Sequence, residues 1–359
     1  MKRLLVILLK ATLSLGILAY LFVGAHRDGS FARLGAQHKD WAALGLAAVF
    51  CSSAVALTMV RWCYLVRAVG LPFTVKDAFR LGFLGYLFNL APLGIIGGDL
   101  LKASMLAWEH PGNKGKAVAS VVVDRLIGLY MLFVVASAAI VASGFWALPV
   151  PGAGWISAIT VAIAVAGGAA LVVLVAMASP DRAAVRRLSR VPRLGAHLEN
   201  SIEALHAYRS RPSVLLAAAA ASVLVHSLFA TGVYFIYSGL RYQGISLGQH
   251  FVIMPLSAVT ALVPLSVGPF EIALEAFYRA VPLAAGLAAE KGHGLIVALG
   301  YRIITLVIAA VGVCYYLGSR REVASVMVEV ERQGEPGAMT AVAAVAPPPQ
   351  TDTQAAGSV

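Results

Sequence analysis

Two arginines lie inside long apolar stretches of the sequence, Arg125 in 117–143 and Arg302 in 294–318. A guanidinium at the centre of a membrane costs at least about 2.5–3.5 kcal/mol unless it is paired or hydrated. Each arginine therefore requires an anion nearby. The candidate anions are the carboxylates of Asp99, Asp124, Glu271 and Glu275 and the phosphodiester of a lipid, whose oxygens fit the fork of a guanidinium.

The role of these arginines depends on which anion each one meets. A permanent pair, such as Arg125 with Asp99 or Arg302 with Glu271, would be structural. An arginine that exchanges the carboxylate for a lipid phosphate would be part of a transport site. A cross-pair between the two sets is a third arrangement, because carriers with inverted repeats bring their two broken helices together.

Asp99 and Glu271 both follow segments in which Pro and Gly interrupt an apolar run. Such irregular backbone is tolerated at membrane depth only where protein or water satisfies its amides. Free amides at the start of a helix favour an anion such as phosphate. The alternative is that the acidic residues cap their helices and the glycines permit close packing. The candidate binding residues are Asn89, Pro92, Gly97, Gly98, Asp99, Lys102 and Arg125 around the first break and Pro264, Gly268, Glu271, Glu275 and Arg302 around the second.

Two of these candidates, Asn89 and Lys102, and one further polar residue, His226, have simpler expected roles. Asn89 precedes the first break, and its side-chain amide could satisfy unwound backbone. Lys102 lies one helical turn after Asp99 and could add a positive charge for a bound anion. His226 lies inside another apolar run, where we expect a hydrogen-bonded packing residue rather than a proton carrier.

The sequence contains no enzyme signature. It has no G-x-S-x-G elbow, no H-E-x-x-H, no P-loop and no G-x-G-x-x-G fingerprint. The three cysteines, Cys51, Cys63 and Cys314, do not have the spacing of a zinc site or of a disulfide framework. We therefore expect neither catalysis nor a resident metal or cofactor.

Composition assigns the chain to the membrane proteins. Hydrophobic residues make up 60% of the 359 residues and charged residues 13%, whereas soluble domains contain about 25% charged residues. Too few charges remain to cover a water-facing surface around a core of this size. The chain has a net charge of +11, from 28 Lys and Arg against 17 Asp and Glu. In a membrane protein this excess indicates basic cytoplasmic loops rather than a nucleic-acid partner.

Eight apolar runs organise the sequence, and most reach the roughly 20 residues needed to cross a bilayer. They cover about 4–25, 41–60, 78–98, 117–143, 155–178, 213–239, 251–269 and 294–318. Pro and Gly interrupt the third and seventh runs, which we predict to be broken helices. The first run contains Lys10 and has no small-residue cleavage site, so we interpret it as a retained first helix rather than a signal peptide.

The distribution of Lys and Arg favours a threading in which both broken elements enter and return on the same side. The loops 61–80, 99–116 and 179–212 then lie in the cytoplasm with both termini, while 26–40, 144–154, 240–250 and 270–293 lie outside. Only the external loop 26–40, with Arg27, Arg33 and Lys39, runs against the distribution of charge. Full crossing by both broken elements would instead place the seven arginines of 179–212 outside. The sequence therefore predicts an all-α polytopic protein of the inner or plasma membrane, with about six spans and two re-entrant elements.

This threading reveals an internal repeat. The two breaks have the same seven-residue spacing from proline to acidic residue, and each is followed by a helix that carries an arginine. The halves, about 1–143 and 155–318, enter from opposite sides, which is an inverted-topology repeat. They form one transmembrane domain over 1–320. The segment 331–359, rich in Pro, Ala, Gly and Thr, is predicted to be a disordered cytoplasmic tail.

Taken in order, these motifs resemble those of the lysylphosphatidylglycerol synthase transmembrane family, also called the flippase-like family. The resemblance spans about 1–320 and is carried by Asn89-Leu-Ala-Pro92, Gly97-Gly98-Asp99-x-x-Lys102, Asp124-Arg125-x-x-Gly128, Pro264-x-Ser266-x-Gly268-x-x-Glu271-x-x-x-Glu275 and Tyr301-Arg302. Pro269-Phe270 stands where the family is usually richer in glycine. In that family the membrane region is similar to the part of lysyl-lipid synthases that moves the aminoacylated lipid between leaflets, and the synthase chemistry resides in a separate soluble domain.

The resemblance implies a lipid translocator without enzyme activity that moves an anionic or aminoacylated phospholipid or a related lipid. Two other classes stay open on the sequence alone. One is a small-molecule or ion transporter of the inverted-repeat type, and the other is a non-transporting scaffold that anchors partners through the Arg-rich 179–212 loop. The implied partners are a membrane lipid and, in addition, a second copy of the chain or a separate lipid-modifying enzyme.

Overall fold

The computed structural model describes residues 2–29, 32, 34–35, 38–90, 97–147, 152–176, 208, 211–263, 265, 267–280 and 292–333. Over these residues the regular structure is helical, and no strand occurs. The expected all-α fold of a polytopic membrane protein is therefore confirmed.

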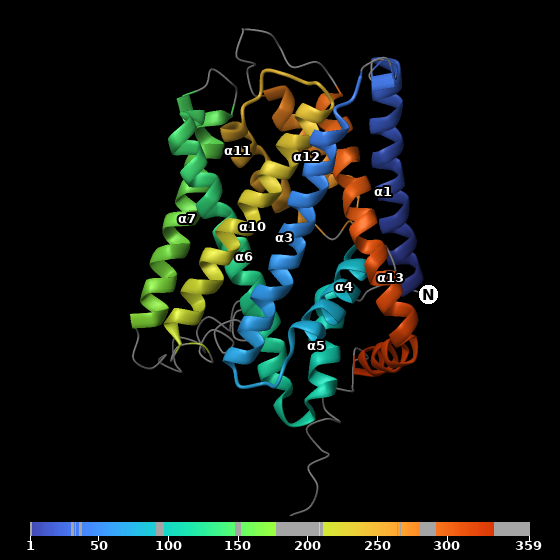
Figure 1. The fold of residues 1–359 in the computed structure, drawn as a ribbon, viewed down its shortest axis with the longest axis vertical. Helices are drawn as coiled ribbons and strands as arrows, with labels where there is room; N and C mark the ends of the chain where they lie inside the picture. The colour runs from blue at the N-terminus through green and yellow to red at the C-terminus, as the bar shows by residue number, and fades with distance from the viewer. Residues whose placement is uncertain are drawn as a thin grey trace, which may run out of the picture.

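Six long helices run roughly along the long axis of the molecule (Figure 1). They are α1 Lys2–Arg27, α3 Trp41–Ala68, α6 Lys114–Ser143, α7 Ala153–Ala176, α10 Pro212–Gly239 and α13 His293–Gln333. Five contain stretches long and apolar enough to cross a membrane, which are Trp41–Ala68, Pro111–Ser143, Ala153–Ala170, Pro212–Gly239 and His293–Val328. The 26 residues of α1 span about 39 Å at 1.5 Å per residue, so α1 adds a sixth helix of sufficient length.

The long helices present apolar side chains outward. Val141, Leu216, Ile303 and Val307 each leave 64% to 73% of their surface exposed. Exposed apolar surface on this scale is costly in water but neutral against lipid tails. The outer face of the bundle is therefore suited to a membrane.

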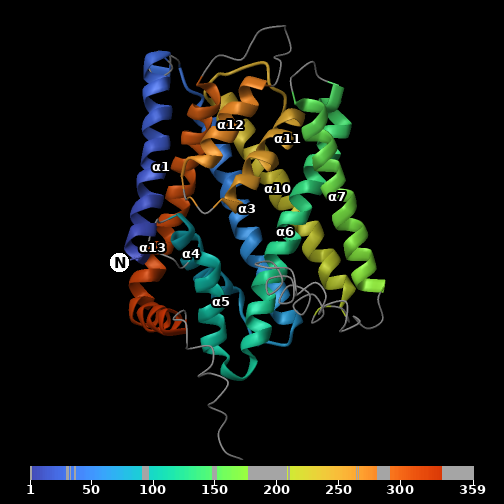
Figure 2. The same ribbon diagram turned by 180° about the vertical axis from the view of Figure 1, so that it is seen from behind.

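Two pairs of shorter helices lie in opposite halves of the bundle (Figures 1 and 2). The pair of α4 Val75–Leu90 and α5 Gly98–Glu109 lies in the lower half of Figure 1, and the pair of α11 Leu247–Ala258 and α12 Pro269–Ala280 lies in the upper half. With 12 to 16 residues each, these helices are about 18–24 Å long. None of them alone can cross a hydrocarbon core about 30 Å thick.

The first helix of each short pair begins with a capping box. Thr74 and Asp77 exchange hydrogen bonds at the start of α4, and Ser246 and Gln249 do the same at the start of α11. Such reciprocal bonds satisfy amides that the first helical turn leaves free. The hydrogen bond that the Thr74 hydroxyl donates also lowers the pKa of the Asp77 carboxyl.

Short 3₁₀ turns complete the connections at Pro111–Asn113, Phe145–Ala147 and Val259–Leu262.

The two halves of the chain contact each other reciprocally. Helices α3 and α10 pack along one another, α4 packs on α13, and α11 packs on α6. The first short helix of each half therefore lies against the last long helix of the other half. Where α4 meets α13, the rings of Phe83 and Tyr315 stack with centroids 5.9 Å apart.

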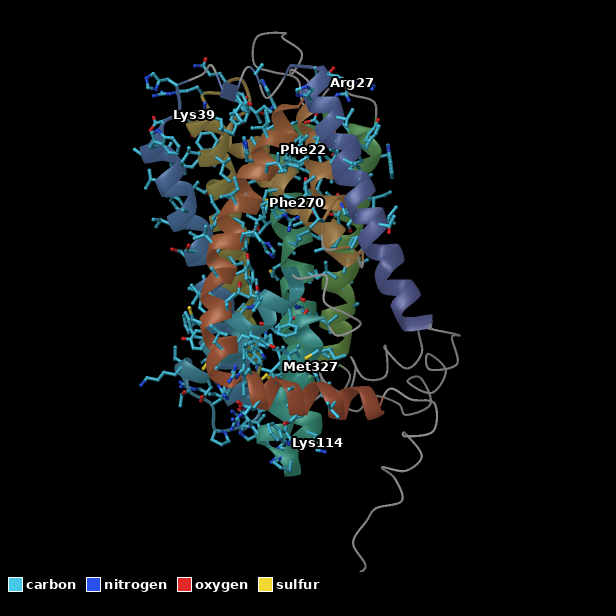
Figure 3. All side chains as sticks on the ribbon, turned by 90° about the vertical axis from the view of Figure 1, so that its right-hand side faces the viewer. Phe22, Arg27, Lys39, Lys114, Phe270 and Met327 are labelled. Atoms are coloured by element: carbon cyan, nitrogen blue, oxygen red, sulfur yellow. The ribbon has the colours of Figure 1, made fainter. Side chains whose placement is uncertain are left out.

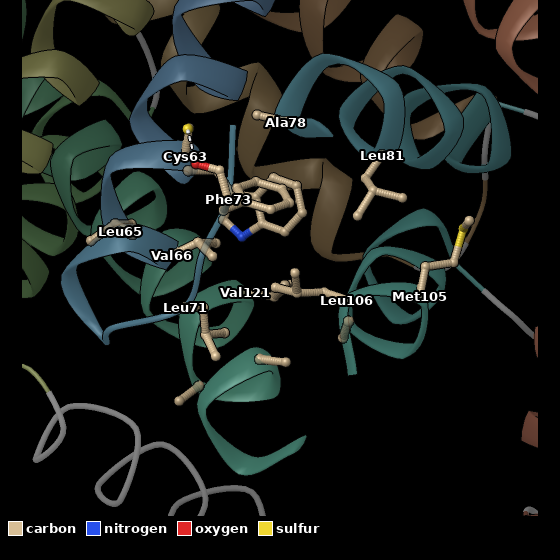
Figure 4. Close-up of a cluster of buried hydrophobic side chains, with 14 of the residues drawn as sticks. Cys63, Leu65, Val66, Leu71, Phe73, Ala78, Leu81, Met105, Leu106 and Val121 are labelled. Carbon is tan, nitrogen blue, oxygen red and sulfur yellow. Dashed lines mark hydrogen bonds between the residues drawn. The ribbon is translucent and has the colours of Figure 1, made fainter. Parts of the chain in front are cut away.

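Among the described residues, two large apolar cores and a smaller cluster between α3 and α13 hold these elements together. The lower core joins α3, α4, α5 and α6 (Figure 4), and its buried members include Leu65, Phe73, Leu81, Leu106 and Val121. The upper core joins α6, α10, α11, α12 and α13, and its buried members include Ile236, Tyr237, Ile253, Leu274 and Val297. Each short pair thus packs into a core of its own at one end of the bundle.

Helix α13 bends at Ser319, where the backbone leaves the helical region (φ −116°, ψ 15°). Beyond the bend it lies across the lower end of the molecule (Figure 3), and Val323 and Val326 are buried in the lower core. Arg80 of α4 forms ion pairs with Glu322 of this segment, at 3.1 Å, and with Glu109 at the end of α5. Residues 331–333, where the tail was expected to begin, are still helical, and 334–359 lie outside the described residues.

The threading is tested by single-cysteine labelling in a background lacking Cys51, Cys63 and Cys314. Asn113→Cys, at the lower end between α5 and α6, should react with an impermeant maleimide only from the cytoplasm, because basic residues concentrate at that end. Gln243→Cys, after the upper end of α10, should react only from outside. Labelling of both positions from the same side would contradict the re-entrant path of α4 and α5.

Candidate functional site

The first break ends where α5 begins, and contacts with α4 fix that start. The Asn89 side-chain oxygen accepts a hydrogen bond of 2.8 Å from the amide of Gly98, as expected for a residue that satisfies unwound backbone. A Cβ on Gly98 would lie 1.7 Å from the carbonyl oxygen of Gly85 in α4. Only glycine at position 98 therefore permits this approach of the two short helices.

An ion pair lies just after this start. The guanidinium of Arg125 donates a hydrogen bond to the carboxylate of Asp99, and 55% of the arginine side chain and 35% of the aspartate side chain are exposed. Arg125 lies eleven residues into α6, or about 17 Å along the helix. An exposed guanidinium at this depth requires water or lipid headgroups around it.

The second break has a corresponding pair with a different environment. Glu271, in the first turn of α12, accepts hydrogen bonds from Arg302 of α13 at 3.0 Å to Nε and 2.5 Å to Nη2. Its other oxygen accepts one of 2.8 Å from the amide of Gly268. Gly268 has φ +112°, a conformation that only glycine adopts without strain. Glu271 is fully buried, and the side chain of Arg302 is 19% exposed.

Glu275 has another role. Its two carboxylate oxygens accept hydrogen bonds of 2.8 Å and 2.9 Å from the amides of Gly292 and Leu295 at the start of α13. The charge thus caps a helix N-terminus, where an anion is stabilising. Among the described residues Glu275 contacts no arginine.

Each arginine therefore meets the carboxylate of its own half, and the described ion pairs include no cross-pair. Gly97 is the N-cap residue of α5, whereas Pro92 and Pro264 lie outside the described residues. The two pairs occupy matching positions in the two halves of the sequence but differ in exposure. We call the pair Asp99–Arg125 open and the pair Glu271–Arg302 occluded.

The comparison with known families adds to this geometry. Residues 7–312 match the family model described as the lysylphosphatidylglycerol synthase TM region. The chain belongs to this family. The resemblance carried by the motifs is confirmed, and membership links this membrane protein to the handling of lipids. A comparison with curated proteins returned no match.

This family member contains a third pair that the sequence analysis did not identify. Arg61 was assigned to a cytoplasmic loop, but α3 continues to Ala68 and buries it. Its guanidinium donates hydrogen bonds to the carboxylate of Asp124 at 2.9 Å and to the Ser222 hydroxyl at 2.6 Å. The signal was present in the sequence, because apolar residues continue on both sides of Arg61 up to Val66.

This buried pair orients the helix that carries Arg125. Asp124 lies next to Arg125 on α6 and faces α3, so Arg125 is directed toward a different neighbour, α5. His226 of α10 adds a hydrogen bond of 2.9 Å to the carbonyl oxygen of Gly128. His226 is therefore hydrogen-bonded in the helix packing, as expected.

Lys102 lies in the first turns of α5, as its position one helical turn after Asp99 predicts, but it is buried rather than part of an exposed cytoplasmic segment. Its ammonium lies 4.1 Å from the centre of a ring of Trp62, and its stem fills the space left by the missing side chain of Gly85. Arg61, Asp124, Arg125 and Lys102 thus gather polar groups where α3, α5 and α6 meet.

Proposed function

We propose that this family member moves a phospholipid between the leaflets of the inner or plasma membrane. The observation that supports this most strongly is the placement of two arginine–carboxylate pairs at the starts of short helices in opposite halves of the bundle. A guanidinium binds phosphate and carboxylate oxygens with similar geometry. A lipid phosphodiester can therefore take the place of Asp99 or Glu271 on its arginine.

The arrangement of the halves favours transport over a fixed scaffold. We interpret the two halves as an inverted repeat, because the capping boxes and the reciprocal packing of α4 on α13 and of α11 on α6 occur in both. Carriers of this type expose a central site alternately to each side. In the state described, the pair Asp99–Arg125 is open and the pair Glu271–Arg302 is occluded.

We assign the lower end, with both termini, to the cytoplasm. The lipid then enters beside α5 from the cytoplasmic leaflet, and the second pair opens in the opposite state. No covalent step is involved. A second copy of the chain, or a separate enzyme that modifies the lipid, is the proposed protein partner.

Substitution of the two arginines tests the transport site. In proteoliposomes carrying a fluorescent phosphatidylglycerol, Arg125→Ala and Arg302→Ala should each slow the movement of the lipid by about tenfold or more, because each loses a charged hydrogen bond to phosphate. Arg→Lys at either position should restore little of the rate, since lysine keeps the charge but lacks the planar fork.

The matched control is Arg320→Ala, which removes an exposed arginine from α13 away from both pairs. This variant should move lipid at the wild-type rate. Wild-type rates in both site variants would contradict the phosphate role. Movement of small anions but not of lipid through the wild-type protein would favour the small-molecule transporter instead.

A further inference from the structure

Lys102 is a buried lysine that forms no hydrogen bond or ion pair with a carboxylate among the described residues. It is 6% exposed, and none of the described ion pairs or hydrogen bonds involves its ammonium group. Its ammonium lies 4.1 Å from the centre of a ring of Trp62, and the carboxylates of Asp124 and Asp99 attract it through space without bonding to it. A buried charge normally requires a counter-ion or several hydrogen bonds, and an aromatic face supplies neither.

A second observation at the same place also indicates a missing acceptor. Trp62 is fully buried, and its indole Nε1 is one of four buried side-chain polar atoms of the described structure that have no hydrogen-bond partner. The indole N–H is purely a donor, as is the lysine ammonium. Two donors from α3 and α5 are therefore neighbours without an acceptor.

The surrounding charges do not supply this acceptor. Asp124 is hydrogen-bonded to Arg61, and Asp99 is paired with Arg125. Among the described residues of this junction, Arg61, Arg125 and Lys102 thus face only Asp124 and Asp99, which leaves one positive charge when Lys102 is protonated. A ligand that balances this site carries a single negative charge and acceptor oxygens.

We propose that Lys102 and Trp62 form an anion-binding point for one phosphodiester and select lipids whose headgroup has a net negative charge. This proposal rests on the function proposed above and narrows its substrate. A zwitterionic or aminoacylated lipid brings its own cation, which the surplus charge at this junction would repel. In this arrangement the lipid phosphate first binds the exposed guanidinium of Arg125. It then binds the buried ammonium of Lys102, between α3 and α5.

The test measures ligand-induced thermal stabilisation of the full chain in detergent. The probes are dihexanoyl phosphatidylglycerol, dihexanoyl phosphatidylcholine and inorganic phosphate. The anionic lipid should raise the melting temperature of the wild-type protein at lower concentration than the other two. Lys102→Met should raise the half-saturating concentration of phosphatidylglycerol by about tenfold or more, and Trp62→Phe should raise it by about three- to tenfold, because they remove a charged and a neutral hydrogen bond.

The control is Lys116→Met, which removes an exposed lysine at the start of α6 and should respond to phosphatidylglycerol as the wild type does. Trp62→Phe keeps the ring for packing, so it tests the N–H even if Lys102→Met folds poorly. Unchanged responses in both variants would overturn the anion point. Equal stabilisation by the two lipids would overturn charge selection, and stabilisation by inorganic phosphate alone would assign the point to a free anion rather than a headgroup.

Lipid movement by the same variants separates this proposal from the function it builds on. If the wild type moves no lipid but its response to phosphatidylglycerol depends on Lys102, the anion point holds and the transport function fails. If the wild type and Lys102→Met move phosphatidylglycerol at equal rates and bind it equally, the transport function holds and the anion point is wrong.

Discussion

Asp124→Asn should lower the free energy of unfolding by about 3–5 kcal/mol, because it leaves the guanidinium of Arg61 buried and uncompensated. Both side chains are at most 5% exposed and lie 2.9 Å apart. Arg61→Met should cost a similar amount, since it leaves the carboxylate of Asp124 unpaired. Loss of the Arg61 side chain does not leave the Ser222 hydroxyl without a partner, because this hydroxyl still donates a hydrogen bond to the carbonyl of Ala218. Ser222 therefore adds little to the cost of Arg61→Met.

The double variant distinguishes a charge pair from two independent losses. Asp124→Asn combined with Arg61→Met removes both charges together and should be more stable than either single variant. Unfolding in detergent, followed by helical circular dichroism against added sodium dodecyl sulfate, measures the three losses. The control is Glu322→Gln at the pair with Arg80, whose side chains are 28% and 27% exposed and where a much smaller loss is expected. Additive losses at Arg61 and Asp124 would show that the pair contributes no coupling.

The sequence predicted the fold class and the long helices because apolar length is a strong signal for membrane spans. Its candidate anions for Arg125 and Arg302 included the observed partners, Asp99 and Glu271, but the sequence did not choose between these, the other carboxylates and a cross-pair. The different environments of the two pairs were beyond the sequence. Asp99 and Glu271 have the same chemistry, and only the packing around them makes one exposed and the other buried.

Loop boundaries limited the prediction of the remaining polar residues. Arg61 and Lys102 were counted in basic cytoplasmic segments because charge normally marks the end of an apolar run, yet Arg61 lies inside α3 and both side chains are buried. Their burial depends on distant groups, which are Asp124 for Arg61 and Trp62 for Lys102. Spacing along one chain does not specify such tertiary contacts. The capping role of Glu275 depends in the same way on the position of α13.

Glu271→Gln should destabilise the protein far more than Asp99→Asn. The first change leaves Arg302 beside a fully buried position without its counter-ion and should cost about 3–5 kcal/mol. The second breaks a pair in which the arginine side chain is 55% exposed, and a pair that is partly exposed contributes less than a fully buried one. Arg302→Gln added to Glu271→Gln should recover part of the loss, whereas Arg125→Gln added to Asp99→Asn should change little.

The coupling energies from these two cycles report the state of each half, because exposure sets how strongly a pair of charges interacts. Thermal unfolding in detergent of the four single variants and the two double variants supplies both values, and the double variant Asp99→Asn with Arg302→Gln supplies the coupling between the halves. A strong coupling at Glu271–Arg302 and a weak one at Asp99–Arg125 would match the occluded and open pairs of this structure. Equal couplings would contradict that asymmetry, and a coupling between Asp99 and Arg302 would instead indicate a cross-pair between the halves. A lipid phosphate can replace Asp99 on Arg125 at a small cost in free energy only if these two side chains are weakly coupled. Entry of the lipid through the first half therefore requires a weak coupling at Asp99–Arg125.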